Sequence, residues 1–422
     1  MNDETVVDVQ TSHALTRRGM LTAAGAAILG AASGFALARA TVTETEPRAT
    51  AAAAPETVIE SSPDPTPLTR QLAFYGDHQV GIETEPALHQ AYVGLDLRKP
   101  SKRNAQAAMR LITDDAARLT SGQPTLGDAQ PDLATNADLL TVTVGLGHSL
   151  LRSAGLGDRE PPGFPTIPAF ANDALEEPWS GTDLLLQVGA NDPVALSHAI
   201  RMLTKDLSTL TTIKWIQKGF LASASADAGH IARRNLMGHP EGGQFPVPGT
   251  PQFSRIVWID DGPDWARGGT VLVLRRMRML FDTWDALEKD AQELAIGRRQ
   301  SDGSPLGSDG PDGALDFNAV DANGLPLIPL DSHVRVAAAP SIEGVILRRP
   351  YNYDDLLPDG RQDRGLLFAA YTANSGKSFI PTQRRLTEQD AFQKWISAVG
   401  SATYFLPPGV QEGAYLASGL LT

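Results

Sequence analysis

The turn at residues 234–243, RNLMGHPEGG, carries two side chains that could move a proton. His239 and Glu241 stand between glycines, which allow the backbone to approach a ligand closely. Imidazole and carboxylate groups are common general acids and bases. A single Glu in such a turn is more often simply solvated, so the turn needs a second group to indicate a site.

A second segment, residues 328–337, reads IPLDSHVRVA and contains His333. Arg348 and Arg349 follow it in the sequence RRPY. An imidazole nitrogen can bind a metal, and a guanidinium group can stabilise negative charge. Taken alone, His333 is more typical of a structural histidine than of a ligand. The two segments together favour a functional site that neither indicates by itself.

Composition limits the chemistry that these segments could support. The chain has 422 residues, no cysteine and a net charge of −13. Without cysteine there are no disulfides, thiolate metal sites, iron–sulfur clusters or covalently attached haem. The negative charge argues against nucleic acid as the main partner. Any metal must therefore be held by His, Asp, Glu or Tyr, or arrive inside a cofactor.

The first half of the chain alternates strand and helix patterns. Residues 140–147, LTVTVGLG, alternate as a half-buried strand does, and residues 184–188, LLLQV, indicate a more buried strand. Asp192 and Pro193 then predict a helix start, with Asp as the N-cap and Pro as the first helical residue. The apolar face of that helix consists of Leu196, Ile200, Leu203, Leu207 and Leu210.

The second half repeats this order. Residues 270–274 and 365–373 predict strands, and residues 282–296 predict an amphipathic helix ended by Gly297. Residues 387–390, TEQD, predict the start of a further helix through Trp395 and Val399. The Gly-, Asp- and Pro-rich residues between 297 and 328 predict a surface loop. Two similar halves of strands and helices favour an α+β class with helices against each sheet.

The N-terminus predicts export. Arg17 and Arg18 precede a weakly apolar run through Leu37, a pattern typical of a twin-arginine signal peptide over residues 1–40. The run is rich in Ala and Gly and barely long enough to span a bilayer, which disfavours the alternative of a membrane anchor and predicts no stable span after cleavage. Residues 41–69 are rich in Ala, Pro, Thr and Glu and predict a disordered linker. Domains are expected at residues 70–247 and 248–422.

The order of these motifs resembles the dye-decolourising peroxidases, specifically the exported branch that includes the deferrochelatase-like proteins. The resemblance covers nearly the whole chain after the linker. Its matching segments are residues 74–82 (FYGDHQVGI), 140–145 (LTVTVG), 183–188 (DLLLQV), 268–270 (GGT), 275–279 (RRMRM), 296–299 (IGRR) and 379–386 (FIPTQRRL). So many ordered matches are hard to obtain by chance.

The resemblance implies a fold of two ferredoxin-like domains, with antiparallel sheets and helices, and one non-covalent b-type haem (heme b) between them. By position, His333 corresponds to the family's proximal iron ligand. Arg348 or Arg349 corresponds to the distal arginine, and Arg348 fits the motif register. Asp390 corresponds to the carboxylate that accepts a hydrogen bond from the proximal imidazole, which orients the ring and raises its basicity.

The distal motif departs from the family's Gly-x-x-Asp-Gly. This chain reads Gly238-His239-Pro240-Glu241-Gly242, so the carboxylate has one more methylene. Either Glu241 reaches the peroxide proton, or the longer side chain turns away and leaves His239 as the nearer acceptor. Geometry decides between them, because a general base must reach its proton directly or through one water.

Three functions compete on this evidence. The resemblance implies an exported haem peroxidase that uses hydrogen peroxide to oxidise bulky organic reductants through a ferryl intermediate, after transport by the twin-arginine translocase. The altered distal motif favours the alternative of a haem carrier or an iron-releasing, deferrochelatase-like protein with weak peroxidase activity. An exported binding module without haem requires a resemblance in architecture alone.

Overall fold

The computed structural model describes residues 70–222, 233–241, 246–311 and 313–422. The predicted signal peptide and linker, and Gly242 and Gly243 of the distal turn, lie outside the described residues. Within the described residues, no helix is long and apolar enough to cross a membrane. The predicted boundary at residues 247 and 248 stays a prediction.

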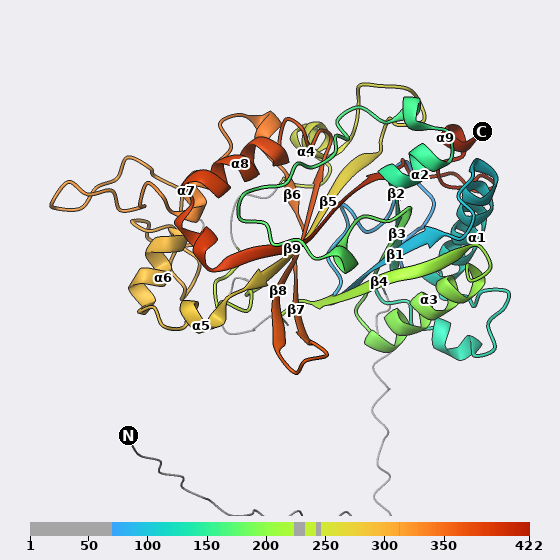
Figure 1. The fold of residues 1–422 in the computed structure, drawn as a ribbon, viewed down its shortest axis with the longest axis horizontal. Helices are drawn as coiled ribbons and strands as arrows, with labels where there is room; N and C mark the ends of the chain where they lie inside the picture. The colour runs from blue at the N-terminus through green and yellow to red at the C-terminus, as the bar shows by residue number, and fades with distance from the viewer. Residues whose placement is uncertain (1–69, 223–232, 242–245, 312) are drawn as a thin grey trace, which may run out of the picture. The chain divides into compact units, whose positions relative to one another are not determined.

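The first half is a four-stranded antiparallel sheet with two long helices on one face (Figure 1). Its spatial order is β2-β3-β1-β4, which with the chain order β-α-β-β-α-β is ferredoxin-like. The elements are β1 (His89–Leu97), α1 (Lys102–Thr120), η1 (Pro131–Ala134), β2 (Thr141–Gly147), α2 (His148–Ser153), η2 (Gly157–Arg159), η3 (Glu177–Trp179), β3 (Leu184–Ala190), α3 (Pro193–Asp206) and β4 (Thr211–Phe220).

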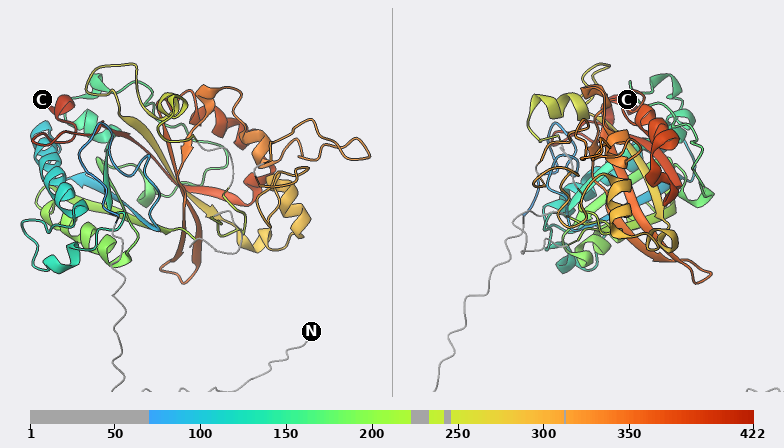
Figure 2. Two further views of the ribbon diagram at one scale, coloured as in Figure 1. Left: turned by 180° about the vertical axis from the view of Figure 1, so that it is seen from behind. Right: turned by 90° about the vertical axis from the view of Figure 1, so that its left-hand side faces the viewer.

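The second half repeats this topology with spatial order β7-β8-β5-β9, so the prediction of two ferredoxin-like α+β units is confirmed. Shorter helices α5 to α8 lie together at its side of the molecule (Figures 1 and 2). The elements are α4 (Pro251–Val257), β5 (Thr270–Met279), α5 (Phe281–Trp284), α6 (Lys289–Ile296), α7 (His333–Ala337), η5 (Ile342–Gly344), β6 (Leu347–Arg348), β7 (Tyr351–Leu356), β8 (Gln362–Thr372), α8 (Phe379–Gln389), η6 (Ala391–Lys394), β9 (Ile396–Leu406) and α9 (Ser418–Leu421).

The two four-stranded sheets join edge to edge. Strand β2 pairs with β9 through Leu146 and Gly147, and β4 pairs with β7 through Phe220. Because β5 also pairs with β8, the strands close into a ring. Large side chains fill the inside of this ring, among them Tyr92, Trp215, Tyr351, Tyr353, Tyr371 and Tyr404, all buried. The inside of the ring is therefore a packed core.

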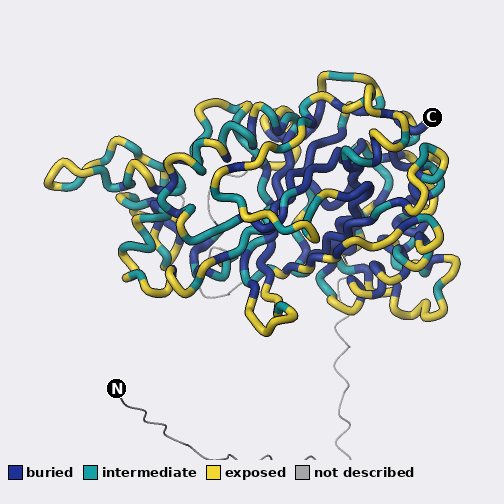
Figure 3. The backbone as a smooth tube through the Cα atoms, viewed as in Figure 1, coloured by how far each residue is buried: buried dark blue, intermediate teal, exposed yellow. Residues whose placement is uncertain are grey.

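Strand residues alternate between this core and the helix-covered faces. On β1, Tyr92 points into the ring, whereas Ala91, Val93 and Leu95 pack with α1 and α3. On β8, Leu367 points into the ring, and Leu366 and Phe368 point outward. The strands are accordingly the most continuously buried part of the molecule (Figure 3). The predicted strands at 140–147, 184–188, 270–274 and 365–373 are confirmed within a few residues.

Helix α3 begins as predicted. The Asp192 carboxylate accepts hydrogen bonds from the N–H groups of Val194 and Ala195, and Pro193 is the first helical residue. The helix ends at Asp206, so Leu207 is its C-cap and Leu210 lies beyond it.

Two helix predictions were wrong. The predicted helix 282–296 is two helices, α5 and α6, because the chain leaves helical geometry at Glu288, whose φ is −63° and ψ is 150°. This break lets both Trp284 and Leu287 pack into one apolar cluster. Gly297 ends α6 as predicted, in the left-handed region at φ 90°.

The helix predicted from residue 387 through Val399 is absent, because Thr387 lies near the end of α8 and Ile396 begins β9. The start signal is nevertheless a genuine cap. The Asp390 carboxylate accepts a hydrogen bond from Phe392 N–H and begins only the short 3-10 helix η6. The residues from Ile396 onward, which the sequence placed in the helix, instead pair with β5 as part of strand β9.

Candidate active site

His333 and Asp390, 57 residues apart in the chain, form a direct pair. His333 is the first residue of α7, and its Nδ1 lies 2.8 Å from Oδ2 of Asp390, between α8 and η6. A backbone hydrogen bond from Ala391 N–H to Asp331 O holds the two segments together. The Asp390 side chain is fully buried, whereas the His333 side chain is 26% exposed. An ionised carboxylate only accepts, so Nδ1 carries the proton and Nε2 carries the lone pair.

The surroundings of His333 are apolar and partly open. Its ring contacts Phe392 with centroids 5.4 Å apart. Leu366 packs with the Phe392 cluster, and Phe368, two residues further on the same strand face, packs with the neighbouring cluster that includes Phe379. Leu366 and Phe368 are both half-buried. An imidazole nitrogen beside a partly open apolar face fits a haem, which needs an axial nitrogen ligand and apolar contact for its ring.

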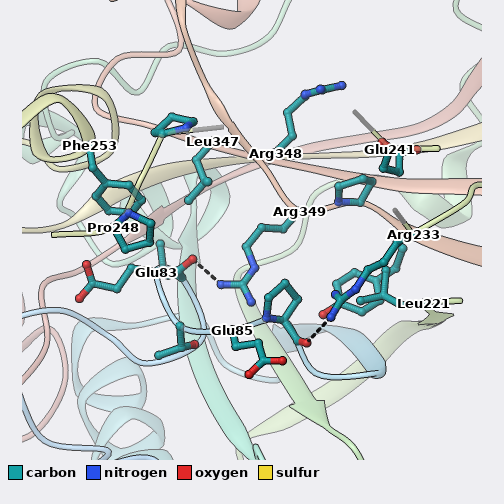
Figure 4. A pocket seen from close by; sticks show the side chains of 16 residues that line it. Glu83, Glu85, Leu221, Arg233, Glu241, Pro248, Phe253, Leu347, Arg348 and Arg349 are labelled. Atoms are coloured by element: carbon teal, nitrogen blue, oxygen red, sulfur yellow. Dashed lines mark hydrogen bonds between the residues drawn. The ribbon is translucent and has the colours of Figure 1, made fainter. Parts of the chain in front are cut away.

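Glu241 and Arg348 line a cavity of about 440 Å³ between segments of the two halves (Figure 4). Residues 82–86 form its wall from the first half, and residues 347–351 form its wall from the second. Glu241 is held from two sides. Its N–H donates to Arg233 O, and its Oε1 accepts a hydrogen bond of 3.2 Å from the amide of Asn235.

Arg348 and Arg349 extend in different directions (Figure 4). Arg349 is buried, and its guanidinium donates to the backbone carbonyl of Ile82, so it connects the two halves. Burial lowers the pKa of the Arg298 guanidinium, and the positive charge of Arg348 lowers it further, so the two groups are close enough to repel each other. Two neighbouring guanidinium groups make a region that favours an anion.

His239 lies in a different environment from Glu241. It is 4% exposed, and neither ring nitrogen has a hydrogen-bond partner among the described residues. Burial lowers the pKa of His239 to about 4, so the ring is neutral at physiological pH. Its ring contacts Trp284 at a centroid distance of 5.9 Å, and it is not among the residues that line the cavity.

The structure thus brings the candidate residues together in two groups. His333 pairs with Asp390 on the helix-covered face of the second sheet, and Glu241, Arg348 and Arg349 line the cavity. Aromatic contacts connect His239 to the first group, from Trp284 to Phe392 at 5.5 Å and from Phe392 to His333.

Sequence reasoning missed two residues beside these groups. Arg298 belongs to a segment used for the resemblance, but its electrostatic interaction with Arg348, which lies far along the sequence, leaves no local signal. Gln393 donates a hydrogen bond of 3.0 Å to Asp390, and its place three residues after that carboxylate in a capped turn was the available signal.

Two family models match this chain. One, described as Dyp-type peroxidase, N-terminal, matches residues 79–221, and the other, described as Dyp-type peroxidase, C-terminal, matches residues 232–411.

Individual relatives agree with the family models. The chain is 36% identical to the dye-decolorizing peroxidase of Thermobifida fusca, over 96% of this chain and 97% of that protein. It is 31% identical to the deferrochelatase of Yersinia pestis, over 82% of this chain and 84% of the relative. The crystal structure of a DyP-type peroxidase from Cellulomonas bogoriensis superimposes with a TM-score of 0.80 at 40% identity, covering 84% of this chain and 98% of that one.

Proposed function

This chain belongs to the Dyp-type peroxidase family and is a haem peroxidase, and we propose that it oxidises bulky organic reductants with hydrogen peroxide outside the cytoplasm. The observation that carries the assignment of the site is the pair of His333 and Asp390, with an imidazole nitrogen directed away from the carboxylate at a half-buried apolar face.

His333 would hold the haem iron through Nε2, while Asp390 accepts a hydrogen bond from the N–H group at Nδ1. The haem, when bound, supplies the iron that takes up oxidising equivalents from peroxide. The buried carboxylate keeps the imidazole in one tautomer and one orientation and increases its basicity. Leu366 and Phe368 offer the apolar contact that a planar ring needs.

In the cavity, Glu241 would accept a proton from peroxide and return it to the departing oxygen. Asn235 steadies the Glu241 carboxylate through the hydrogen bond to Oε1. Arg348 would stabilise the negative charge that develops as the O–O bond breaks, with Arg298 adding positive charge nearby. Arg349 has a structural role in this proposal, because its guanidinium is bonded to Ile82 O.

The test of this site is the replacement His333→Ala. We expect the purified full chain to show a Soret band, and the variant to lose most bound haem while the protein still folds, because the imidazole is the only iron ligand proposed. His89→Ala, at a half-buried histidine of β1, is the control. Full haem content with an unchanged coordination spectrum in His333→Ala would show that the ligand assignment is wrong.

A second candidate function is iron release from haem. The longer distal carboxylate of Glu241, together with the likeness to proteins named deferrochelatase, favours it. The two functions separate when haem-loaded protein is mixed with peroxide and a dye. Rapid, repeated dye oxidation supports the peroxidase, whereas free iron and porphyrin without dye turnover support haem handling.

Export is a further part of the proposal. The pair Arg17 and Arg18 and the apolar run after it would direct the chain to the twin-arginine translocase, which carries folded proteins. A protein exported by this route would carry its haem with it to the periplasm, the cell surface or the medium.

A further inference from the structure

The Asp390 carboxylate accepts other hydrogen bonds besides the one from His333. Its Oδ2 atom, 2.8 Å from His333 Nδ1, also accepts a hydrogen bond of 3.0 Å from Nε2 of Gln393. Its Oδ1 accepts the Phe392 N–H at 2.9 Å. His333 and Gln393 therefore share one carboxylate oxygen inside the protein.

The Gln393 amide is itself held by a residue from the other half of the chain. Gln393 Oε1 accepts a hydrogen bond from Nδ2 of Asn172, which lies in the connection between β2 and β3. Asn172 Oδ1 in turn accepts the hydroxyl of Thr387 on α8 at 3.1 Å. Asn172 is also fixed through its backbone carbonyl, which accepts the Ser397 hydroxyl.

The Asp390 carboxylate, at the end of this series of hydrogen bonds, determines which group donates in each of them. Because an ionised Asp390 can only accept, Gln393 must turn its NH₂ group toward it and its oxygen toward Asn172. Asn172 must then present its own NH₂ group, which leaves its oxygen for the Thr387 hydroxyl. The series Thr387, Asn172, Gln393, Asp390 thus has one consistent arrangement of donors.

We propose that Gln393, oriented by Asn172, is a positioning residue that weakens the Asp390 carboxylate as an acceptor for His333 and so limits the basicity of the proximal imidazole. Each N–H donated to Oδ2 stabilises its negative charge and reduces its pull on the imidazole proton. This inference rests on the proposed role of His333 as the iron ligand. It assigns the connection between β2 and β3, in the first half, a role in tuning a site of the second half.

The test uses Gln393→Met in the haem-loaded full chain, because Met keeps the approximate volume and removes the donor. A stronger Asp390 acceptor makes the imidazole more anionic and stabilises ferric iron. We expect the ferric–ferrous midpoint potential to shift to more negative values and the iron–imidazole stretching frequency in resonance Raman spectra of the ferrous protein to rise. Gln389→Met, at an exposed residue of α8, is the matched control and should change neither quantity.

A second variant keeps the test decisive if Gln393→Met folds poorly. Asn172→Leu leaves Gln393 in place and removes the group that orients its amide, so it should shift both quantities in the same direction by a smaller amount. In an Asp390→Asn background, Gln393→Met should add no further shift, because the glutamine acts through the carboxylate.

Each failure has its own signature. If Gln393→Met and Asn172→Leu bind haem fully and keep the wild-type potential and stretching frequency, the positioning role is wrong even though His333→Ala loses haem. An equal shift in the Asp390→Asn background would also overturn it, because the effect would then bypass Asp390. If His333→Ala keeps its haem and coordination spectrum, it is the proposed ligand that fails.

Discussion

Glu241 and His239 lie two residues apart, but one side chain lines a cavity and the other is buried in the protein. Glu241 lines the cavity with Arg348, whereas His239 is buried beside Trp284 with a pKa lowered to about 4 by burial. A neutral imidazole of such low basicity is a poor match for proton transfer near neutral pH. The Glu241 carboxylate is oriented by the hydrogen bond that it accepts from Asn235.

We expect Glu241→Gln to slow the reaction with peroxide by roughly 10²–10⁴-fold, the usual effect of losing a general acid–base group. Haem content should not change. His239→Ala should have a smaller effect, since its ring is neutral and does not line the cavity. Stopped-flow measurement of the Soret change after mixing with peroxide gives both rates. A larger loss in His239→Ala would mean that the histidine performs the proton transfer.

The adjacent arginines should separate into a catalytic and a structural effect. Arg349→Ala removes a charged donor from the buried Ile82 carbonyl, so it should lower the free energy of unfolding by about 1.5–3 kcal/mol. Arg348→Ala should reduce the rate with peroxide more strongly than Arg349→Ala does in the protein that remains folded. Urea titration and stopped-flow absorbance provide the two measurements. The opposite pattern would assign the distal role to Arg349.

At the scale of elements, helices α1 and α3 bring two carboxyl groups together. Asp115 on α1 is buried, and burial together with the charge of Asp206, the last residue of α3, raises its pKa to about 7. The folded protein therefore keeps a proton on Asp115 at pH values where the unfolded chain has released it. Since the folded state binds more protons, stability decreases as pH rises from about 4 to 7.

Replacing Asp115 with Asn should remove this pH dependence. The gain in unfolding free energy relative to wild type should be larger at pH 8 than at pH 4, by about 1.4 kcal/mol for each unit of the pKa shift at most. Chemical denaturation at the two pH values measures it. Asp158→Asn, at an exposed residue of η2, is the control. An identical pH profile in wild type and Asp115→Asn would show that Asp115 does not retain this proton in the folded protein.

At the scale of the whole chain, we propose that the N-terminal residues act as an export signal. Replacing both Arg17 and Arg18 with Lys should retain the protein in the cytoplasm with haem bound. Cell fractionation followed by Soret absorbance of each fraction tests this. Normal export of the double variant would exclude the twin-arginine route.

The two halves are joined by few strand pairs and by a large common core. Among the described residues, the ladder pairs between the sheets involve Leu146 and Gly147 of β2 and Phe220 of β4, with an isolated bridge from Ser180 to Ser401, whereas buried aromatic residues from both sheets fill the ring. The candidate site also includes residues of both halves. Residues 82–86 and 347–351 form walls of the cavity, and Asn172 of the first half donates a hydrogen bond to Gln393 of the second.

The sequence by itself determined much of this protein, because the signals were local. Local strand patterns predicted β2, β3, β5 and β8, and Asp192 with Pro193 predicted the start of α3. Motif order indicated the family and selected His333 and Asp390 as partners.

The tertiary structure alone decided what depends on distant residues. The residues from Ile396 to Val399 fit a helix as well as a strand, and only pairing with β5 makes them part of β9. Which distal side chain lines the cavity, the approach of Arg298 to Arg348, and the bond from Asn172 to Gln393 likewise follow from packing between segments far apart in the chain. Local patterns specify periodicity and caps, whereas contacts across such separations are fixed only when the sheets close and their shared core fills.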